Sequence, residues 1–205
     1  HPVDGFVRAR LAAAGLAPNP RGDPRALVRR AYHVLLGLPP TLERLERFAA
    51  DPSPQAWTAL IDELLARPEY GQRWARHWLD VARYADTTDK STDSERRIPF
   101  AHTYRDYVIE ALNRDLPYDR FVREQLAADL LPAAESPDLR ALGFLTVGRR
   151  FEGNLDAPEL IIDDRIDTIG RGLLGLTVAC ARCHDHKFDA ITQRDYYALT
   201  GFLLS

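Results

Sequence analysis

The chain has 205 residues, 45% of them hydrophobic, which is enough to bury a sizeable core within one domain. Its 27 Lys and Arg side chains nearly balance its 30 Asp and Glu, and the formal charge of -3 excludes a global field that would favour nucleic acid or an anionic membrane. No run of about eighteen apolar residues occurs, so we expect no membrane insertion.

Apolar residues follow helical spacing along almost the whole chain, and we find no convincing alternating strand, internal repeat or low-complexity tract. The predicted fold class is therefore all-α, with a single helical domain over residues 1–205. Helices are predicted over residues 2–15, 24–37, 41–50, 54–66, 69–85, 100–113, 118–130, 158–176 and 193–204.

Local signals mark several of these boundaries. Ser53 before Pro54 is an N-cap followed by a first-position proline, and Thr192 with Asp195 forms a capping-box pattern. Residues 86–99 and 131–137 are polar or proline-rich and are predicted to be loops. The segment 158–176 carries a narrow apolar stripe that we expect to be buried: Ile162, Ile166, Ile169, Leu173 and Leu176.

The only two cysteines of the chain belong to a C-x-x-C-H motif formed by Cys180, Cys183 and His184. This spacing lets two thiols add across the two vinyl groups of one haem while the following histidine, a good iron ligand, reaches the metal. We therefore predict one covalently bound haem c, held by a C-terminal C-x-x-C-H attachment loop, with His184 as an axial ligand.

Three other interpretations of the cysteines stay open. Zinc would use Cys180, Cys183, His184 and His186, but one short loop without a distant ligand pair closes a tetrahedral shell with difficulty. A thioredoxin-like redox pair needs a strand before the motif, and no strand is visible there. The third interpretation is a pair of buried structural thiols.

Long motifs extend over nearly the whole chain. They are Gly37 to Thr41, Gly71 to Asp80, Ala82 to Asp86, Tyr104 to Ile109, Asn113 to Asp119, Gly175 to Asp189 and Gln193 to Tyr197. On these motifs the sequence resembles the family of planctomycete cytochrome-c-like domains, whose biochemical role is unassigned.

The resemblance implies a periplasmic or otherwise exported haem-c domain, usually followed by another domain in a larger polypeptide. The motif supports the same location, because haem is attached covalently outside the cytoplasm. We expect the chain to be a piece of such a protein, since it begins with His1. It departs from the family pattern at Ala190, where proline normally follows Phe-Asp, and at His33 and His102.

Methionine is absent, so the chain cannot supply a thioether to the second axial position of the iron. His77 is the best candidate for the second ligand, because it lies on an aromatic helix face that we expect to point inward. A core histidine with ordinary hydrogen bonds is the alternative. His33 and His102 are expected at the surface. The aromatic face consists of Tyr70, Trp74, His77, Val81 and Tyr84.

Haem carries two propionates, and three cations near the motif are candidates to pair with them: Arg182, Lys187 and Arg171. Solvated surface charge is the alternative for these side chains. His186 lies two residues after His184 and cannot easily reach the opposite face of the same haem. We expect it to hydrogen-bond a propionate or the neighbouring backbone.

One-electron transfer to a redox partner protein or an adjoining domain is the function we expect, with two histidines on the iron. The alternative is a haem enzyme domain whose open distal site acts on peroxide, oxygen or an organic substrate, assisted by side chains such as Arg83 or Tyr84. A third interpretation is a haem that only stabilises the fold. No residue is assigned a catalytic role.

Overall fold

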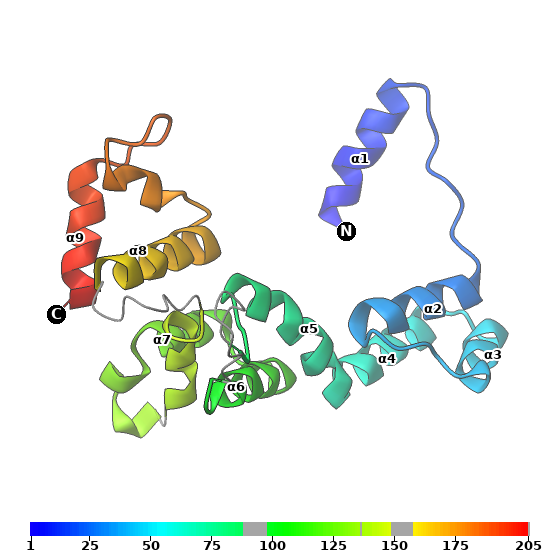
Figure 1. The fold of residues 1–205 in the computed structure, drawn as a ribbon. Helices are drawn as coiled ribbons and strands as arrows, with labels where there is room; N and C mark the ends of the chain where they lie inside the picture. Colours follow the sequence, from blue (N-terminus) through cyan, green and yellow to red (C-terminus); the bar gives the residue numbers. More distant parts are fainter. Residues whose placement is uncertain (88–97, 136, 149–157, 205) are drawn as a thin grey trace. The chain divides into compact units, whose positions relative to one another are not determined.

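The computed structural model describes residues 1–87, 98–135, 137–148 and 158–204, and within these ranges the chain is helical, without a β-strand (Figure 1). The all-α prediction is confirmed. Each predicted helix is present: α1 (Pro2–Ala13), α2 (Pro24–Leu35), α3 (Leu42–Ala50), α4 (Pro54–Leu65), α5 (Pro68–Val81), α6 (Ala101–Asn113), α7 (Tyr118–Ala127), α8 (Pro158–Ile169) and α9 (Gln193–Leu204).

Both predicted helix caps are confirmed. The Ser53 hydroxyl accepts a hydrogen bond from the Ala56 N–H at 3.2 Å, as an N-cap of α4 does. At the start of α9, the Thr192 N–H donates to the Asp195 carboxylate at 2.8 Å and the Asp195 N–H donates back to the Thr192 hydroxyl at 3.2 Å. These reciprocal bonds satisfy backbone donors that a helix start leaves unpaired.

Five short helical segments lie between these α-helices in the described part of the chain. They are η1 (Ala128–Leu130), η2 (Ala133–Glu135), η3 (Leu139–Leu145), η4 (Gly170–Leu174) and η5 (Val178–Arg182). The predicted helix over 158–176 therefore ends at Ile169, where the π-helical η4 begins. Most of the predicted loop 86–99 lies outside the described residues.

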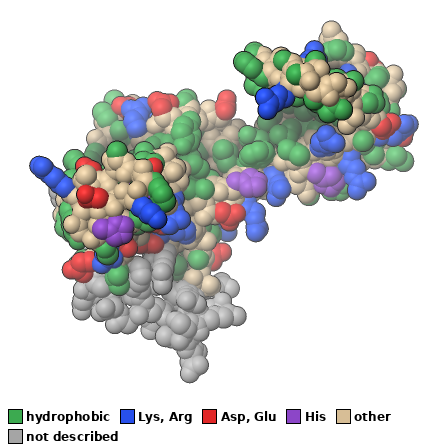
Figure 2. Space-filling model, turned by 90° about the horizontal axis from the view of Figure 1, so that it is seen from above, with side chains coloured by type: hydrophobic (Ala, Val, Ile, Leu, Met, Phe, Trp, Pro, Cys, Tyr) green, Lys and Arg blue, Asp and Glu red, His purple; other side chains and the backbone are tan. Residues whose placement is uncertain are grey.

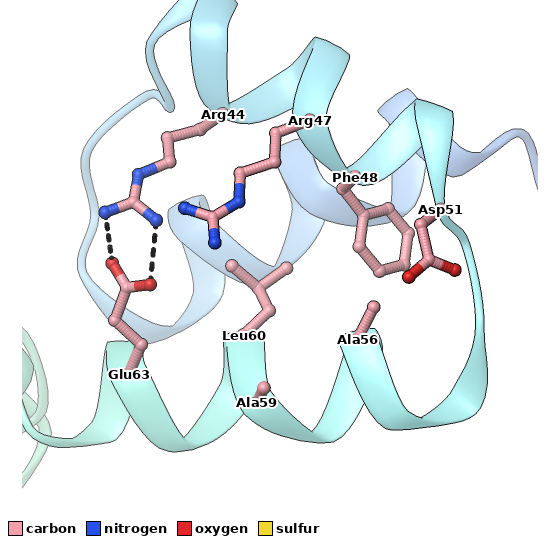
Figure 3. A pocket seen from close by; sticks show the side chains of 8 residues that line it. All are labelled: Arg44, Arg47, Phe48, Asp51, Ala56, Ala59, Leu60 and Glu63. Carbon is pink, nitrogen blue, oxygen red and sulfur yellow. Dashed lines mark hydrogen bonds and ion pairs between the residues drawn. The ribbon is translucent and has the colours of Figure 1, made fainter.

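A compact unit, His1–Leu64, contains α1 to α4. A pocket of about 220 Å³ lies between α3 and α4. Figure 3 shows both terminal nitrogens of Arg44 meeting the Glu63 carboxylate beside it. This ion pair joins the two helices beside their apolar contact. The buried hydrophobic side chains of the unit are Val28, Ala31, Tyr32, Leu36, Phe48, Leu60 and Leu64.

A second compact unit, Leu65–Ser205, contains the cysteine motif. One hydrophobic cluster lies among α5, α6, α7 and η3, where the Trp78 ring packs against Phe121 and Phe144 with centroids 4.9 and 5.7 Å away. Another joins α8, η5 and α9 and is formed by Ile162, Ile166, Val178, Ala181 and Tyr196. The single domain expected over residues 1–205 stays a prediction.

Helix α5 packs against α6 through its small residues. Gly71 and Ala75 are buried, and the Gly71 N–H donates to the Asn113 side-chain oxygen at 2.8 Å. A Cβ atom at position 71 would lie 2.6 Å from the Asn113 side chain and from the Ile109 carbonyl oxygen. The close approach of the two helices therefore requires glycine at this position.

No helix in the described part of the chain is long and apolar enough to cross a bilayer. On the face that Figure 2 shows, Lys and Arg side chains are interspersed with Asp and Glu, in keeping with the formal net charge of -3.

Gly71→Ala is expected to lower the free energy of unfolding by about 1–3 kcal/mol, because the added methyl group overlaps α6. Urea unfolding followed by circular dichroism measures the change. The control is Gly201→Ala in α9, where nothing lies within 4 Å of the added Cβ. That variant should be neutral or more stable by up to about 1 kcal/mol. Equal stability of the two variants would contradict the α5–α6 packing.

Candidate functional site

The 3₁₀ helix η5 presents both cysteines on one side. Residues three apart in such a helix lie above one another. Val178 and Ala181 are buried against α8 and α9, whereas Cys180 and Cys183 are free thiols and exposed to solvent. The sequence predicted an attachment loop here, but Cys180 lies within η5 and Cys183 is its C-terminal cap. The two cysteine side chains therefore lie on the same exposed face of a short helix.

The His184 side chain is exposed and held by one ring nitrogen. Its Nδ1 atom lies 2.7 Å from the Asp185 carbonyl oxygen. A carbonyl only accepts hydrogen bonds, so Nδ1 carries the proton and Nε2 keeps its lone pair. This tautomer is the one in which a histidine binds a metal through Nε2 while its other nitrogen fixes the ring.

Both ring nitrogens of His186 are already used within the protein. Nδ1 accepts the backbone N–H groups of Phe188 and Asp189, at 3.3 and 2.9 Å. Nε2 therefore carries the proton and donates to the Thr177 hydroxyl at 2.9 Å. Of the two roles expected for His186, the structure supports the hydrogen bonds to neighbouring backbone. The His186 ring therefore links the loop after Cys183 to Thr177, the residue before η5.

Side chains on both sides of His186 anchor the motif to α9. The Asp185 carboxylate accepts the N–H of Gln193, the first residue of α9, at 2.8 Å. The Gln193 side chain in turn donates to the Arg182 carbonyl oxygen at 3.0 Å. Asp163 of α8 accepts the Tyr196 hydroxyl at 2.7 Å and pairs with the Arg182 guanidinium at 3.2 Å. The cysteine segment is thus fastened to both α8 and α9.

The cations near the cysteines have partners in the protein. Arg182 pairs with Asp163, and Arg171 donates to Asp167 at 2.6 Å. The Lys187 ammonium lies 5.0 Å from the centre of the Phe188 ring. Contacts of these three side chains with haem propionates stay predictions.

His77 does not point inward, and that part of the prediction is wrong. It is exposed on α5, with its ring edge-on to Trp74 at a centroid distance of 5.3 Å. The buried face of α5 is the small-residue face that includes Gly71 and Ala75, because only small side chains allow α6 to approach so closely. His77 forms no hydrogen bond with any residue that the structure describes, so the alternative of a hydrogen-bonded core histidine is also wrong. Its role as a ligand stays a prediction.

His33 and His102 are both exposed, as predicted. The Arg83 guanidinium, which the enzyme interpretation used, pairs with the Asp164 carboxylate of α8. The Tyr84 hydroxyl donates to Asp86, and burial raises the pKa of this phenol to about 12, with the Asp86 carboxylate adding to the shift. Tyr84 therefore keeps its proton at neutral pH.

The alternative interpretations of the cysteines can be compared with this geometry. Both thiols are exposed, so the interpretation as buried structural thiols is wrong. In the ranges that the structure covers, no group of three His, Cys, Asp or Glu side chains is arranged to hold a metal ion. His186, the fourth ligand of the zinc interpretation, has both nitrogens engaged. The described residues contain no strand before the motif, which the redox interpretation needs.

An apolar pocket begins at η5 and extends between α8 and α9. Its volume is about 120 Å³, and its surface is almost wholly hydrocarbon. The side chain of Val178, two residues before Cys180, also lines an adjoining pocket of about 420 Å³. Neither cysteine lines these pockets, which lie on the buried side of η5 where Val178 packs. The residues of the smaller pocket are Ile166, Ile169, Gly170, Leu174, Val178, Leu199, Phe202 and Leu203.

Residues 2–205 match the model of a protein family, PSCyt2, described as a protein of unknown function (DUF1549). The chain belongs to this family. No curated protein and no solved structure matches the sequence. The PSCyt2 description carries no activity, so the function has to be argued from the residues of the site.

Sequence reasoning missed the side chains that hold the motif in place. Thr177 and Asp163 are ordinary polar residues with no spacing signal that links them to His186 or Arg182. The capping role of Asp185 also lacked a signal, because eight positions separate it from Gln193. In this part of the loop the sequence drew attention only to His186 and Lys187, as candidate partners of a haem propionate.

His186→Ala is expected to lower the free energy of unfolding by about 0.5–1.5 kcal/mol, because it removes the hydrogen bonds that close the loop, while water replaces the imidazole at the exposed N–H groups of Phe188 and Asp189. His33→Ala, which removes an exposed histidine from α2, is the control and should have little effect. Urea unfolding compares the two variants. Faster amide hydrogen exchange at Phe188 and Asp189 should accompany the loss, and unchanged exchange there would contradict the role of His186.

Proposed function

We propose that this PSCyt2 chain binds one covalent haem c through Cys180 and Cys183, with His184 as an axial ligand, and that it transfers single electrons. The observation that carries the proposal is the shared exposed face of the two thiols beside a histidine whose Nε2 is free. The resemblance to planctomycete cytochrome-c-like domains supports it.

The chemistry of the two cysteine thiols and His184 fits a covalently attached haem. Each thiol adds across one vinyl group, so that one C–S bond forms and the thiol hydrogen moves to the neighbouring carbon, without any oxidant. The addition needs both sulfurs free and accessible, and both are. When bound, the haem iron supplies a site that gains and loses one electron. The chain contributes the orientation of His184, fixed by the Asp185 carbonyl.

His77 is proposed as the second axial ligand. Its ring nitrogens are unused by the described residues, and it lies in the same compact unit as the cysteines. The exposed face of α5 continues to Val81, which meets η4, and η4 in turn packs against Val178 at the start of η5. Two imidazole ligands would lower the reduction potential relative to a histidine and methionine pair.

Covalent attachment of haem also implies where the protein works. We place the chain in the periplasm or another exported location, as part of a larger protein, with a redox partner protein or an adjoining domain as the source or acceptor of electrons. The near balance of charges suggests recognition of this partner by local contacts rather than by a global field.

Expression together with a c-type haem maturation system tests the attachment. After denaturation and extraction with acidified organic solvent, the haem absorbance should stay with the chain. Cys180→Ala and Cys183→Ala should each lower the yield of attached haem, and the double variant should abolish it. Complete loss of haem from the unsubstituted chain on extraction would defeat the proposal, and zinc in the purified protein would favour the zinc interpretation.

The second ligand is tested by His77→Ala in the haem-loaded protein, with His102→Ala as the matched control. The unsubstituted protein should be low-spin, and His77→Ala should become high-spin and bind cyanide at least tenfold faster. His102→Ala should keep the low-spin spectrum. A native protein that is already high-spin and binds peroxide would support the enzyme alternative. A low-spin His77→Ala variant would exclude His77 as the ligand.

A further inference from the structure

Two pockets of the second compact unit meet and form one groove. Val178, Leu199 and Phe202 line both of them, so the smaller pocket of about 120 Å³ continues into the larger one of about 420 Å³. Figure 1 shows α8 and α9 next to each other, with the segment that contains η5 beside them. The groove lies among these elements, on the side of η5 that is turned away from the thiols.

The smaller pocket accepts only hydrocarbon. None of the side chains that line it has a group that can donate or accept a hydrogen bond. A polar group placed there would lose its hydrogen bonds to water without gaining others, which is unfavourable. Apolar cavities of similar size stay free of water and take up small apolar molecules instead. The smaller pocket therefore has room for the end of one hydrocarbon chain.

The short helix η4 gives the smaller pocket its shape. It is a π-helix, a rare conformation that often occurs at functional sites. Gly170, its first residue, lies so close to the start of η5 that an added Cβ atom would be 2.9 Å from the Leu176 carbonyl oxygen and 3.1 Å from Val178. Leu174, its last residue, and Phe202 of α9 both line the pocket, yet they are 56% and 78% exposed. A ligand in the pocket would therefore remove exposed apolar surface from water.

The larger pocket adds a negative charge to the groove. Asp195 is the one charged side chain among the described residues that line either pocket. The N–H and the hydroxyl of Thr192 both donate to its carboxylate at 2.8 Å and lower its pKa, so Asp195 is ionised at neutral pH. An ionised carboxylate attracts a cation, accepts hydrogen bonds from a neutral hydroxyl and repels another anion.

We propose that this groove binds a molecule with one hydrocarbon chain and an uncharged or cationic head group. The end of the chain occupies the smaller pocket, and the head group lies in the larger pocket beside Asp195. A fatty acid, which has the same chain but an anionic head group, is therefore disfavoured. The inference goes beyond the proposed function, because neither cysteine lines the groove and binding there does not depend on haem.

Titration of the isotope-labelled full chain, followed by two-dimensional NMR, tests the groove with butanol, hexanol and octanol as probes. The largest shifts should belong to the backbone amides of Val178 and Leu199. Affinity should rise about threefold to fourfold with each added methylene until the pocket is full. Octylammonium should bind at least as tightly as octanol, and octanoate should bind about fivefold more weakly. Equal affinity for the three alcohols would overturn the proposal.

A substitution on α9 blocks the groove. Ala198 is exposed and lines the larger pocket, so Ala198→Trp should abolish the binding of octanol. The control is Gly201→Trp, because position 201 is exposed on the same helix, lines neither pocket and has nothing within 4 Å of an added Cβ. This control should bind octanol as the unsubstituted chain does. Undiminished binding by Ala198→Trp would locate the probe elsewhere and overturn the proposal.

The comparison of octylammonium with octanoate uses the unsubstituted chain, so it tests the head group even if Ala198→Trp fails to fold. Octanoate that binds as tightly as octylammonium would overturn the position of the head group beside Asp195. Protein without haem should bind octanol as well as the haem-loaded protein does. A requirement for attached haem would contradict the independence of this groove from the proposed function.

Discussion

The hydrogen bonds of the His186 imidazole are the constraint on which the candidate site depends. Between Cys183 and Thr192 the chain has no helix or strand to fix its course. His186 binds two backbone N–H groups of this stretch and the Thr177 hydroxyl before η5, at distances of 2.9 to 3.3 Å. His184 lies inside the segment that these bonds close. The position of His184 and its free Nε2 atom therefore depends on neighbouring residues that are not themselves proposed as iron ligands.

The sequence was sufficient to predict the helices because helix signals are local. The apolar period predicted α1 to α9, and the caps at Ser53 and Thr192 followed from side chains within three residues of the bonds they make. The break of the helix after Ile169 was missed because it depends on a tertiary contact. There Gly170 comes close to Val178 of η5, which local spacing does not encode.

The orientation of α5 shows a second limit of sequence reasoning. Its aromatic face has a stronger apolar pattern than the face of Gly71 and Ala75, yet the small residues are buried. Bulky side chains do not fit where two helices approach closely. The residue of α6 that contacts Gly71 is Asn113, which is 42 positions away in the sequence. The ion pair between Arg83 and Asp164 was equally hard to predict, because the two residues are 81 positions apart in the sequence. Chemistry carried by adjacent residues, such as the C-x-x-C-H motif, was recognisable at once.

The central claim is that Cys180 and Cys183 are the covalent anchors of one haem. Mass spectrometry of peptides from the denatured protein, after maturation in a c-type haem system and digestion, tests it most directly. The account predicts that the peptide with both cysteines gains the mass of a single haem and that neither thiol can then be alkylated. An unmodified peptide, with both thiols open to alkylation, would contradict it.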